Sequence, residues 1–277
     1  MKAEGAVELL IVFRPRGLRS AAVKASTTMY AEALARGSTL ALLDLPKGME
    51  KLLKRSLNPA LALEEAVRSG LLPSSRSALW VLEPVVDAAA KVAKELGADV
   101  LCYGEASELI EEWRLAGDVA RLTLRASIAG VKPRDLDEWL SLLNRSLELG
   151  SRSLSRAVDE LALHVARAER PICLAGLEAW ELAKRLGRLG VAVELKSAGL
   201  PYLYRPLEVA FKLLAAGRLS REYLKQLVEE HVEFIKKFVM PSASIDEAYE
   251  AWLKSKAPWL ARLGRSWSWS PTSPEAF

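Results

Sequence analysis

The chain has 277 residues, of which 51% are hydrophobic and 27% are charged, and its formal net charge is +4. These values are typical of a folded protein with a substantial core, and they exclude an intrinsically disordered chain. The small positive excess is spread over predicted helices, for example at residues 51–55, which disfavours nucleic acid as a partner. No run of about 18 apolar residues occurs, so we expect no membrane span.

The cysteines and the rare amides point to the setting of the protein. Cys102 and Cys173 each fall in an apolar run, so we expect buried, reduced thiols rather than a disulfide framework. Glu4 and Glu8 stand where a secretory signal would be basic and then apolar, which favours a cytoplasmic location. Glutamine and asparagine are scarce, a depletion that points to a thermophilic source, although a GC-rich genome would produce part of the same bias.

The first predicted unit is a strand, a helix and a second strand. Residues 7–13 form an apolar run that breaks at Arg14-Pro15-Arg16-Gly17, a helix follows over residues 18–36, and Gly37 closes it. Residues 38–43 form the second strand, which ends at Asp44. This β-α-β unit places two arginines after its first strand and a carboxylate after its second.

The middle of the chain is mostly helical. Short helices are predicted over residues 47–55 and 61–69, Pro84 opens a longer helix that Gly97 ends, and residues 98–103 form the third strand. Residues 105–170 are helical throughout, with breaks predicted at Gly117, at residues 130–133 and at Gly150.

The strand pattern returns at residues 171–176 and 191–195. Three helices follow over residues 207–216, 220–238 and 245–256, with Ser220 and Ser244 as expected N-caps and Ser244 with Glu247 as a capping box. Together the elements predict an α/β fold, a mostly parallel sheet of about five strands covered by helices, with a large helical insertion and a helical C-terminal region. We expect a core of residues 1–104 and 171–200, an insertion or layer of residues 105–170, helices of residues 201–257 packed on the core, and a Ser/Pro/Trp tail of residues 258–277.

Ligands of such folds bind at the carboxyl ends of the strands, so these ends supply the candidate site. The anion-binding candidates are Arg14, Arg16 and Lys196, the candidate bases or metal ligands are Asp44, Glu105 and Glu178, and Tyr103 and Gly176 would line the pocket. An arginine pair binds carboxylate or phosphate well, and it can equally form ion pairs with Asp44 or Glu105. Asp44 could act as a base or ligand, although capping the next helix is favoured two to one.

Familiar catalytic and cofactor motifs are absent from the sequence. It has no GxGxxG after the first strand and no P-loop, so no nucleotide-cofactor motif is present. It also has no GxSxG motif of a nucleophilic serine. His164 and His231 both fall inside helices, which excludes a histidine-rich metal centre. The remaining metal option is Mg²⁺ at a carboxylate site, and otherwise the cofactor is unknown.

Three strand ends carry a family resemblance: Phe13-Arg14-Pro15-Arg16, Leu43-Asp44-Leu45-Pro46 and Ala175-Gly176-Leu177-Glu178. In pattern, the order of elements over residues 7–195 resembles the TraB/erythromycin-esterase/ChaN-like group. That group has a histidine motif, a Glu-rich turn and a Gly-x-x-His at these places, and both histidines are missing here. The resemblance implies that the same edge of the sheet binds a ligand, and it assigns no catalytic role.

Two functions from different classes follow. The first is a binding or scaffold component that contacts a protein partner, or further copies of itself, through its helices and the tail, where Trp259, Trp267 and Trp269 are the contact candidates. The second is a hydrolase-like enzyme on a small anionic substrate, with Arg14 and Arg16 holding the anion and Asp44 or Glu105 as base or Mg²⁺ ligand. Binding is favoured slightly, and nucleic-acid binding ranks third.

Overall fold

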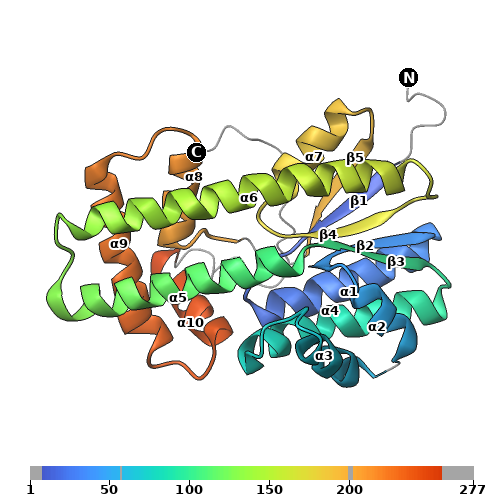
Figure 1. Ribbon diagram of the computed structural model, residues 1–277, viewed down its shortest axis with the longest axis horizontal. Helices are drawn as coiled ribbons and strands as arrows, with labels where there is room; N and C mark the ends of the chain where they lie inside the picture. Colours follow the sequence, from blue (N-terminus) through green and yellow to red (C-terminus); the bar gives the residue numbers. More distant parts are fainter. Residues whose placement is uncertain (1–7, 57, 199–201, 258–277) are drawn as a thin grey trace. The chain divides into compact units, whose positions relative to one another are not determined.

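The computed structural model describes residues 8–56, 58–198 and 202–257. In these residues the strands are β1 (Glu8–Phe13), β2 (Leu40–Pro46), β3 (Asp99–Gly104), β4 (Ile172–Ala175) and β5 (Ala192–Ser197). They form one all-parallel sheet in the order β3-β2-β4-β1-β5 (Figure 1). The predicted α/β fold with about five parallel strands is therefore confirmed.

The helices of the described residues follow in chain order. They are α1 (Arg19–Arg36), α2 (Met49–Arg55), α3 (Pro59–Arg68), α4 (Arg76–Glu95), α5 (Ala106–Ala129), α6 (Asp135–Val165), α7 (Ala179–Arg188), α8 (Pro206–Ala215), α9 (Arg221–Phe234), the π-helical turn η1 (Ile235–Val239) and α10 (Ile245–Lys256). None of them is long and apolar enough to cross a membrane.

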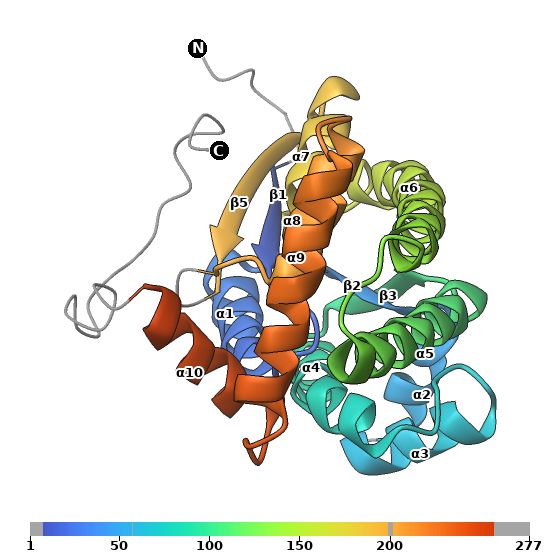
Figure 2. The same cartoon turned by 90° about the vertical axis from the view of Figure 1, so that its left-hand side faces the viewer.

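Helices cover both faces of the sheet. The chain crosses the sheet in one direction from β1 to β2 and β3, and in the other from β3 to β4 and β5. Right-handed crossovers place the connections of the two directions on opposite faces. Accordingly, α1 to α4 lie on one face and α7 and the C-terminal part of α6 on the other (Figure 1, Figure 2). Strand residues are therefore apolar on both faces, and Leu9 to Val12 are all fully buried.

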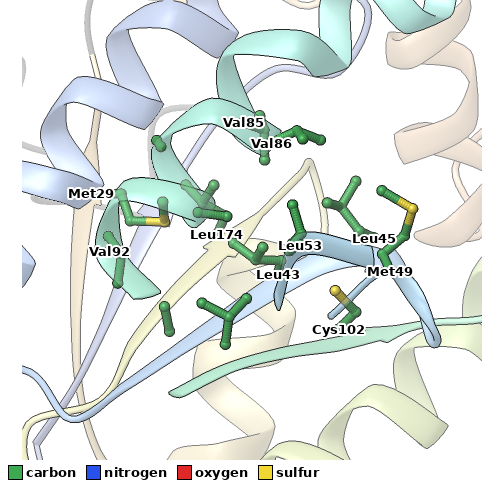
Figure 3. Packing of buried hydrophobic residues seen from close by; sticks show 14 of the residues in the cluster. Met29, Leu43, Leu45, Met49, Leu53, Val85, Val86, Val92, Cys102 and Leu174 are labelled. Carbon is green, nitrogen blue, oxygen red and sulfur yellow. The ribbon is translucent and has the colours of Figure 1, made fainter. Parts of the chain in front are cut away.

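One core fills the space between the sheet and α1 to α4 (Figure 3). Leu43 of β2 and Leu174 of β4 belong to it together with Met29 of α1 and Val86 of α4. Cys102 lies in the same core, and both cysteines are free and buried, as the sequence predicts. Burial raises the pKa of the Cys102 thiol well above its usual value, so it stays protonated.

The first β-α-β unit forms largely as predicted. Gly37 ends α1 in the left-handed conformation, with φ 62°, which a residue without a Cβ adopts at little cost. One boundary differs from the prediction, because β2 continues to Pro46 and Asp44 lies inside the strand. Asp44 does not cap α2 either, since the residue before that helix is Gly48 and no side chain caps it. The predicted cap is wrong.

Pro84 does not open a helix, because α4 begins eight residues earlier and passes through it. A proline inside a helix has no N–H for the carbonyl one turn before it, which here is that of Trp80. The Arg19 guanidinium donates a hydrogen bond to that carbonyl, and it also stacks on the Trp80 ring and pairs with Glu83. A side chain of α1 therefore replaces the missing donor, and α4 continues.

Two of the three breaks predicted between residues 105 and 170 are also wrong. α5 runs through Gly117 and α6 through Gly150, whereas the break at residues 130–133 is confirmed. A glycine inside a helix costs about 1 kcal/mol relative to alanine, which two helices of 24 and 31 residues can absorb.

The chain divides into two compact units. Within the described residues, the α/β unit takes in residues 8–110 and 153–198, and the helical unit takes in residues 111–152 and 202–257. The α/β unit thus includes part of the region predicted as a helical insertion or layer, and the rest of that region groups with the C-terminal helices. The predicted tail, residues 258–277, lies outside the described residues.

The helical unit has a core of its own. Leu115 and Leu122 of α5 and Trp139 of α6 belong to it, together with Ala210 of α8 and Leu227 of α9. Figure 2 shows α8 to α10 in orange to red and α5 in green.

Serine side chains cap the N-termini of α9 and α10. Ser220 and Ser244 accept hydrogen bonds from the N–H groups of Tyr223 and Glu247, at 3.1 and 3.2 Å, as predicted. The Glu247 carboxylate reaches back to the N–H of Ala243, one residue earlier than in a standard capping box.

Candidate functional site

The strand order brings three predicted positions together at one edge of the sheet. β4 lies between β1 and β2, so the residues that follow β1, end β2 and follow β4 are neighbours. The chain leaves β1 and β2 towards one face and leaves β4 towards the other, and this reversal marks the place where open α/β sheets bind ligands. We call the side chains of Arg14, Arg16, Asp44 and Glu178 at this edge the strand-end site.

Arg14 and Asp44 form a buried ion pair at the centre of the strand-end site. Arg14 is 2% exposed, and its Nη2 donates to Oδ1 and Oδ2 of Asp44 at 2.9 and 3.0 Å. The Arg14 backbone N–H donates to the carbonyl of Ala175 at 2.9 Å, which fixes the start of the side chain against β4. The Arg14 Nε is buried and has no hydrogen-bond partner among the residues that the structure describes.

Arg16 joins this pair to Glu178. Its Nε donates to Oδ2 of Asp44 at 3.2 Å and its Nη2 to Oε1 of Glu178 at 2.9 Å. The same Glu178 oxygen accepts the backbone N–H of Gly176 at 3.0 Å. A Cβ at Gly176 would lie only 2.8 Å from Arg16 Nε and from Glu178 Oε2, so the absence of a side chain leaves room for Arg16. A residue without a side chain at position 176 therefore leaves the space in which Arg16 pairs with Asp44 and Glu178.

The Asp44 carboxyl is held in its ionised form. Its burial raises the pKa, but the charges and hydrogen bonds of Arg14 and Arg16 outweigh that effect, and the net pKa of Asp44 is lowered. A general base works best with a pKa near the operating pH, and a carboxylate stabilised by two guanidinium groups has a weak tendency to take a proton. The site therefore does not prepare Asp44 as a base.

Glu105 belongs to a second ion-pair network. It pairs with Lys47 at 3.0 Å and with Arg156 of α6 at 3.7 Å. Lys47 also pairs with Glu160 at 2.6 Å, and these hydrogen bonds to Glu160 and Glu105 raise the pKa of Lys47. Arg156 also forms an ion pair with Glu108. Neither Lys47 nor Arg156 was predicted from the sequence, because no local pattern shows that α6 meets the end of β3.

Two other candidates have structural roles. The Tyr103 hydroxyl donates to the carbonyl of Leu174 at 2.7 Å, and burial raises its pKa well above the usual value. Lys196 lies within β5 rather than after it, and it pairs with Glu32 of α1. The prediction that Lys196 helps to bind an anion at the strand ends therefore has no support.

The charges of the two networks nearly cancel. Four cations, Arg14, Arg16, Lys47 and Arg156, face five carboxylates, Asp44, Glu178, Glu105, Glu108 and Glu160. An anionic ligand would therefore compete with carboxylates that already hold the arginines. In the described part of the chain, no group of three or more His, Cys, Asp or Glu side chains could hold a metal ion.

A groove of about 830 Å³ lies on the α/β unit between α1 and α4 and includes Val23 and Pro84. Its charged groups also pair within the chain, Arg19 with Glu83 and Lys91 with Asp87. The Tyr30 hydroxyl donates to Glu95, which raises the pKa of Tyr30. Nothing in this groove selects a particular ligand.

The helical unit presents a different kind of surface. Trp113, Gly117, Ala120, Leu124 and Ile128 recur at helical spacing on the exposed side of α5, and we call them the α5 stripe. The exposed fractions of Trp113, Leu124 and Ile128 are 37%, 63% and 80%. The opposite side of the helix, which includes Leu115 and Leu122, is buried in the core of the helical unit. α5 is thus apolar on two faces, and among the described residues only the face with Leu115 and Leu122 is covered.

The fold and the strand-end site define a doubly wound α/β protein whose usual ligand position is filled by ion pairs of its own chain. No family model, curated protein or solved structure matches the chain.

Proposed function

We propose that the protein is a binding component that contacts another protein through the α5 stripe. The observation that carries the proposal is the exposure of Trp113, Leu124 and Ile128 on one face of one helix. Along that face the stripe extends for roughly 22 Å, at the rise of an α-helix.

The cost of leaving this face in water supports the proposal. Single exposed apolar side chains are normal on protein surfaces, whereas a contiguous apolar stripe usually marks a contact surface. Full burial of a leucine or isoleucine side chain contributes about 1.5–3 kcal/mol relative to full exposure. Leu124 and Ile128 are mostly exposed, so a partner that covers them recovers most of that free energy.

The strand-end site gives less support to the hydrolase alternative. Arg14 and Arg16, which would hold an anionic substrate, are occupied by Asp44 and Glu178, and the lowered pKa of Asp44 makes it a weak base. The resemblance to the TraB/erythromycin-esterase/ChaN-like group stays a prediction about fold and ligand position.

The setting of the protein is part of the proposal. A cytoplasmic location is consistent with the two free, buried cysteines, and a thermophilic source stays a prediction from composition. Trp259, Trp267 and Trp269 lie outside the described residues, and we retain them as further contact candidates.

The test compares a stripe variant with a matched control. Leu124→Glu/Ile128→Glu places two charges in the stripe, and Leu34→Glu places one at an apolar residue of α1 that is 58% exposed. Each tagged protein is used to capture partners from cells that express the chain. A captured protein is then purified, and its affinity is measured by calorimetry. We expect the stripe variant alone to lose binding. Equal binding by all three proteins would refute the proposed function.

A further inference from the structure

We infer that the partner of the α5 stripe is a second copy of this chain, paired antiparallel across a two-fold axis. The inference rests on the proposed function and adds the identity of the partner. It is drawn from the order of large and small residues along the stripe, which is Trp113, Gly117, Ala120, Leu124 and Ile128.

The stripe is complementary in size to itself when it is reversed. A two-fold axis that crosses α5 between Ala120 and Arg121 pairs residues that are equally far from that point. It places Leu124 of each copy against Gly117 of the other, and Trp113 against Ile128. A Cβ built at Gly117 meets nothing within 4 Å in the part of the chain that the structure describes, so the glycine leaves an open notch there. Each notch thus faces a large side chain, as packed helix pairs require.

The small residues lie where the two helices come closest. Ala120 is next to the axis, and Gly117 is one turn away from it. Two helices with small side chains at their crossing can approach more closely than the usual 8–10 Å between axes. The large residues Trp113 and Ile128 lie at the ends of the stripe, where they would cover the small centre from both sides.

The charges beside the stripe are also complementary. Arg121 is exposed and pairs with Asp118 of its own helix at 3.3 Å. The two-fold operation keeps each flank on its own side of the dimer, so Arg121 of one copy lies diagonally across from Asp118 of the other. Arg145 of α6 also pairs with Asp118 within the chain, at 3.5 Å, so each aspartate lies among arginines on this flank of the stripe.

The first experiment measures the oligomeric state over a range of concentrations by sedimentation. We expect a concentration-dependent dimer for the wild-type chain. Gly117→Leu fills the notch, and it should raise the dimer dissociation constant by about tenfold or more, as forced overpacking does. The same change removes a helix-interior glycine, so the melting temperature should not fall. Leu34→Glu, on α1, is the control and should leave the dimer unchanged.

The second experiment tests the orientation with a short bis-maleimide. Cys102 and Cys173 are buried, so the wild-type chain is the unreactive background. We expect Ala120→Cys to cross-link with itself. Trp113→Cys and Ile128→Cys should cross-link when mixed and not when alone.

Three outcomes overturn the inference: a wild-type chain that is monomeric at every accessible concentration, a dimer that Gly117→Leu does not weaken, or self-cross-linking of both end variants. These results are distinct from failure of the proposed function. If the wild-type chain is monomeric but the stripe variant loses a captured, purified partner, the function stands and the second copy is excluded. If neither self-association nor partner binding depends on the stripe, both proposals fail.

Discussion

Asp44→Asn tests the central ion pair of the strand-end site. The change removes the charge that faces Arg14 and leaves one oxygen to accept a hydrogen bond. Arg14 is 2% exposed and cannot turn into water without moving the end of β1. Removing one partner of a buried pair costs about 3–5 kcal/mol, because the other charge stays buried and uncompensated. We expect Asp44→Asn to lower the free energy of unfolding by about 3 kcal/mol, because Arg16 and the asparagine oxygen offset part of the cost of leaving Arg14 unpaired.

The assay is urea unfolding followed by circular dichroism, with Asp99→Asn as the matched control. Asp99 forms an ion pair with Lys54 at 3.3 Å, but both side chains are more than half exposed. Exposed ion pairs contribute roughly 0–1 kcal/mol to stability, so Asp99→Asn should change the free energy of unfolding little. The reasoning is refuted if Asp44→Asn destabilises the protein no more than Asp99→Asn does. Replacing both Arg14 and Asp44 by leucine should be less harmful than Asp44→Asn alone.

The pH dependence of the Asp44→Asn effect follows from the lowered pKa of Asp44. A group with a lower pKa in the folded state stabilises the protein above its unfolded pKa, which is about 3.9 for aspartate. That contribution is lost as the pH falls through the folded value. The difference between wild type and variant should therefore be constant above about pH 5 and should shrink below about pH 4.

Three further predictions concern single positions. Burial is the main cause that lowers the pKa of His231 to about 4. In an NMR titration its imidazole should therefore stay neutral until the pH is well below 6.5, the usual pKa of histidine. Titration of His231 near pH 6.5 would contradict this. A Cβ at Gly104 would lie 2.8 Å from the backbone oxygen of Leu45, whereas the atoms nearest to a Cβ at Gly176 belong to side chains. Gly104→Ala should therefore lower the free energy of unfolding by about 1–3 kcal/mol, and Gly176→Ala should lower it by less. The opposite order in urea unfolding would contradict this explanation. Ser244→Ala removes the cap of α10 and should cost about 1 kcal/mol in the same assay, while Ser244→Asp should retain it, and equal losses would exclude the capping role.

The sequence predicted what depends on local pattern. Apolar runs located the strands, Gly37 located the end of α1, and Ser220 and Ser244 located two helix starts. The positions of Arg14 and Asp44 at one edge of the sheet also follow from the parallel strands, and ion pairing between them was one of the two readings left open.

The prediction failed where distant side chains decide the outcome. Pro84 lies inside α4 because Arg19, far away in the chain, supplies the missing donor. Arg156 reaches Glu105 only because α6 lies beside the end of β3. The predicted break at Gly117 also prevented a prediction of the α5 stripe. A helix that ends at Gly117 cannot carry Trp113 and Ile128 on one face.

Two polar contacts help to specify the order of four strands that are alike in composition. Apolar residues on both faces of a strand specify its neighbours weakly, because any two such strands can pair. Arg14 and Asp44 join β1 to β2 across the end of β4, and Tyr103 joins β3 to β4 across β2. Both contacts span one intervening strand, and both fit the observed order β3-β2-β4-β1. The polar groups at the usual ligand position of this fold are paired with one another within the chain, and for this reason we propose the exposed face of α5 as the contact surface.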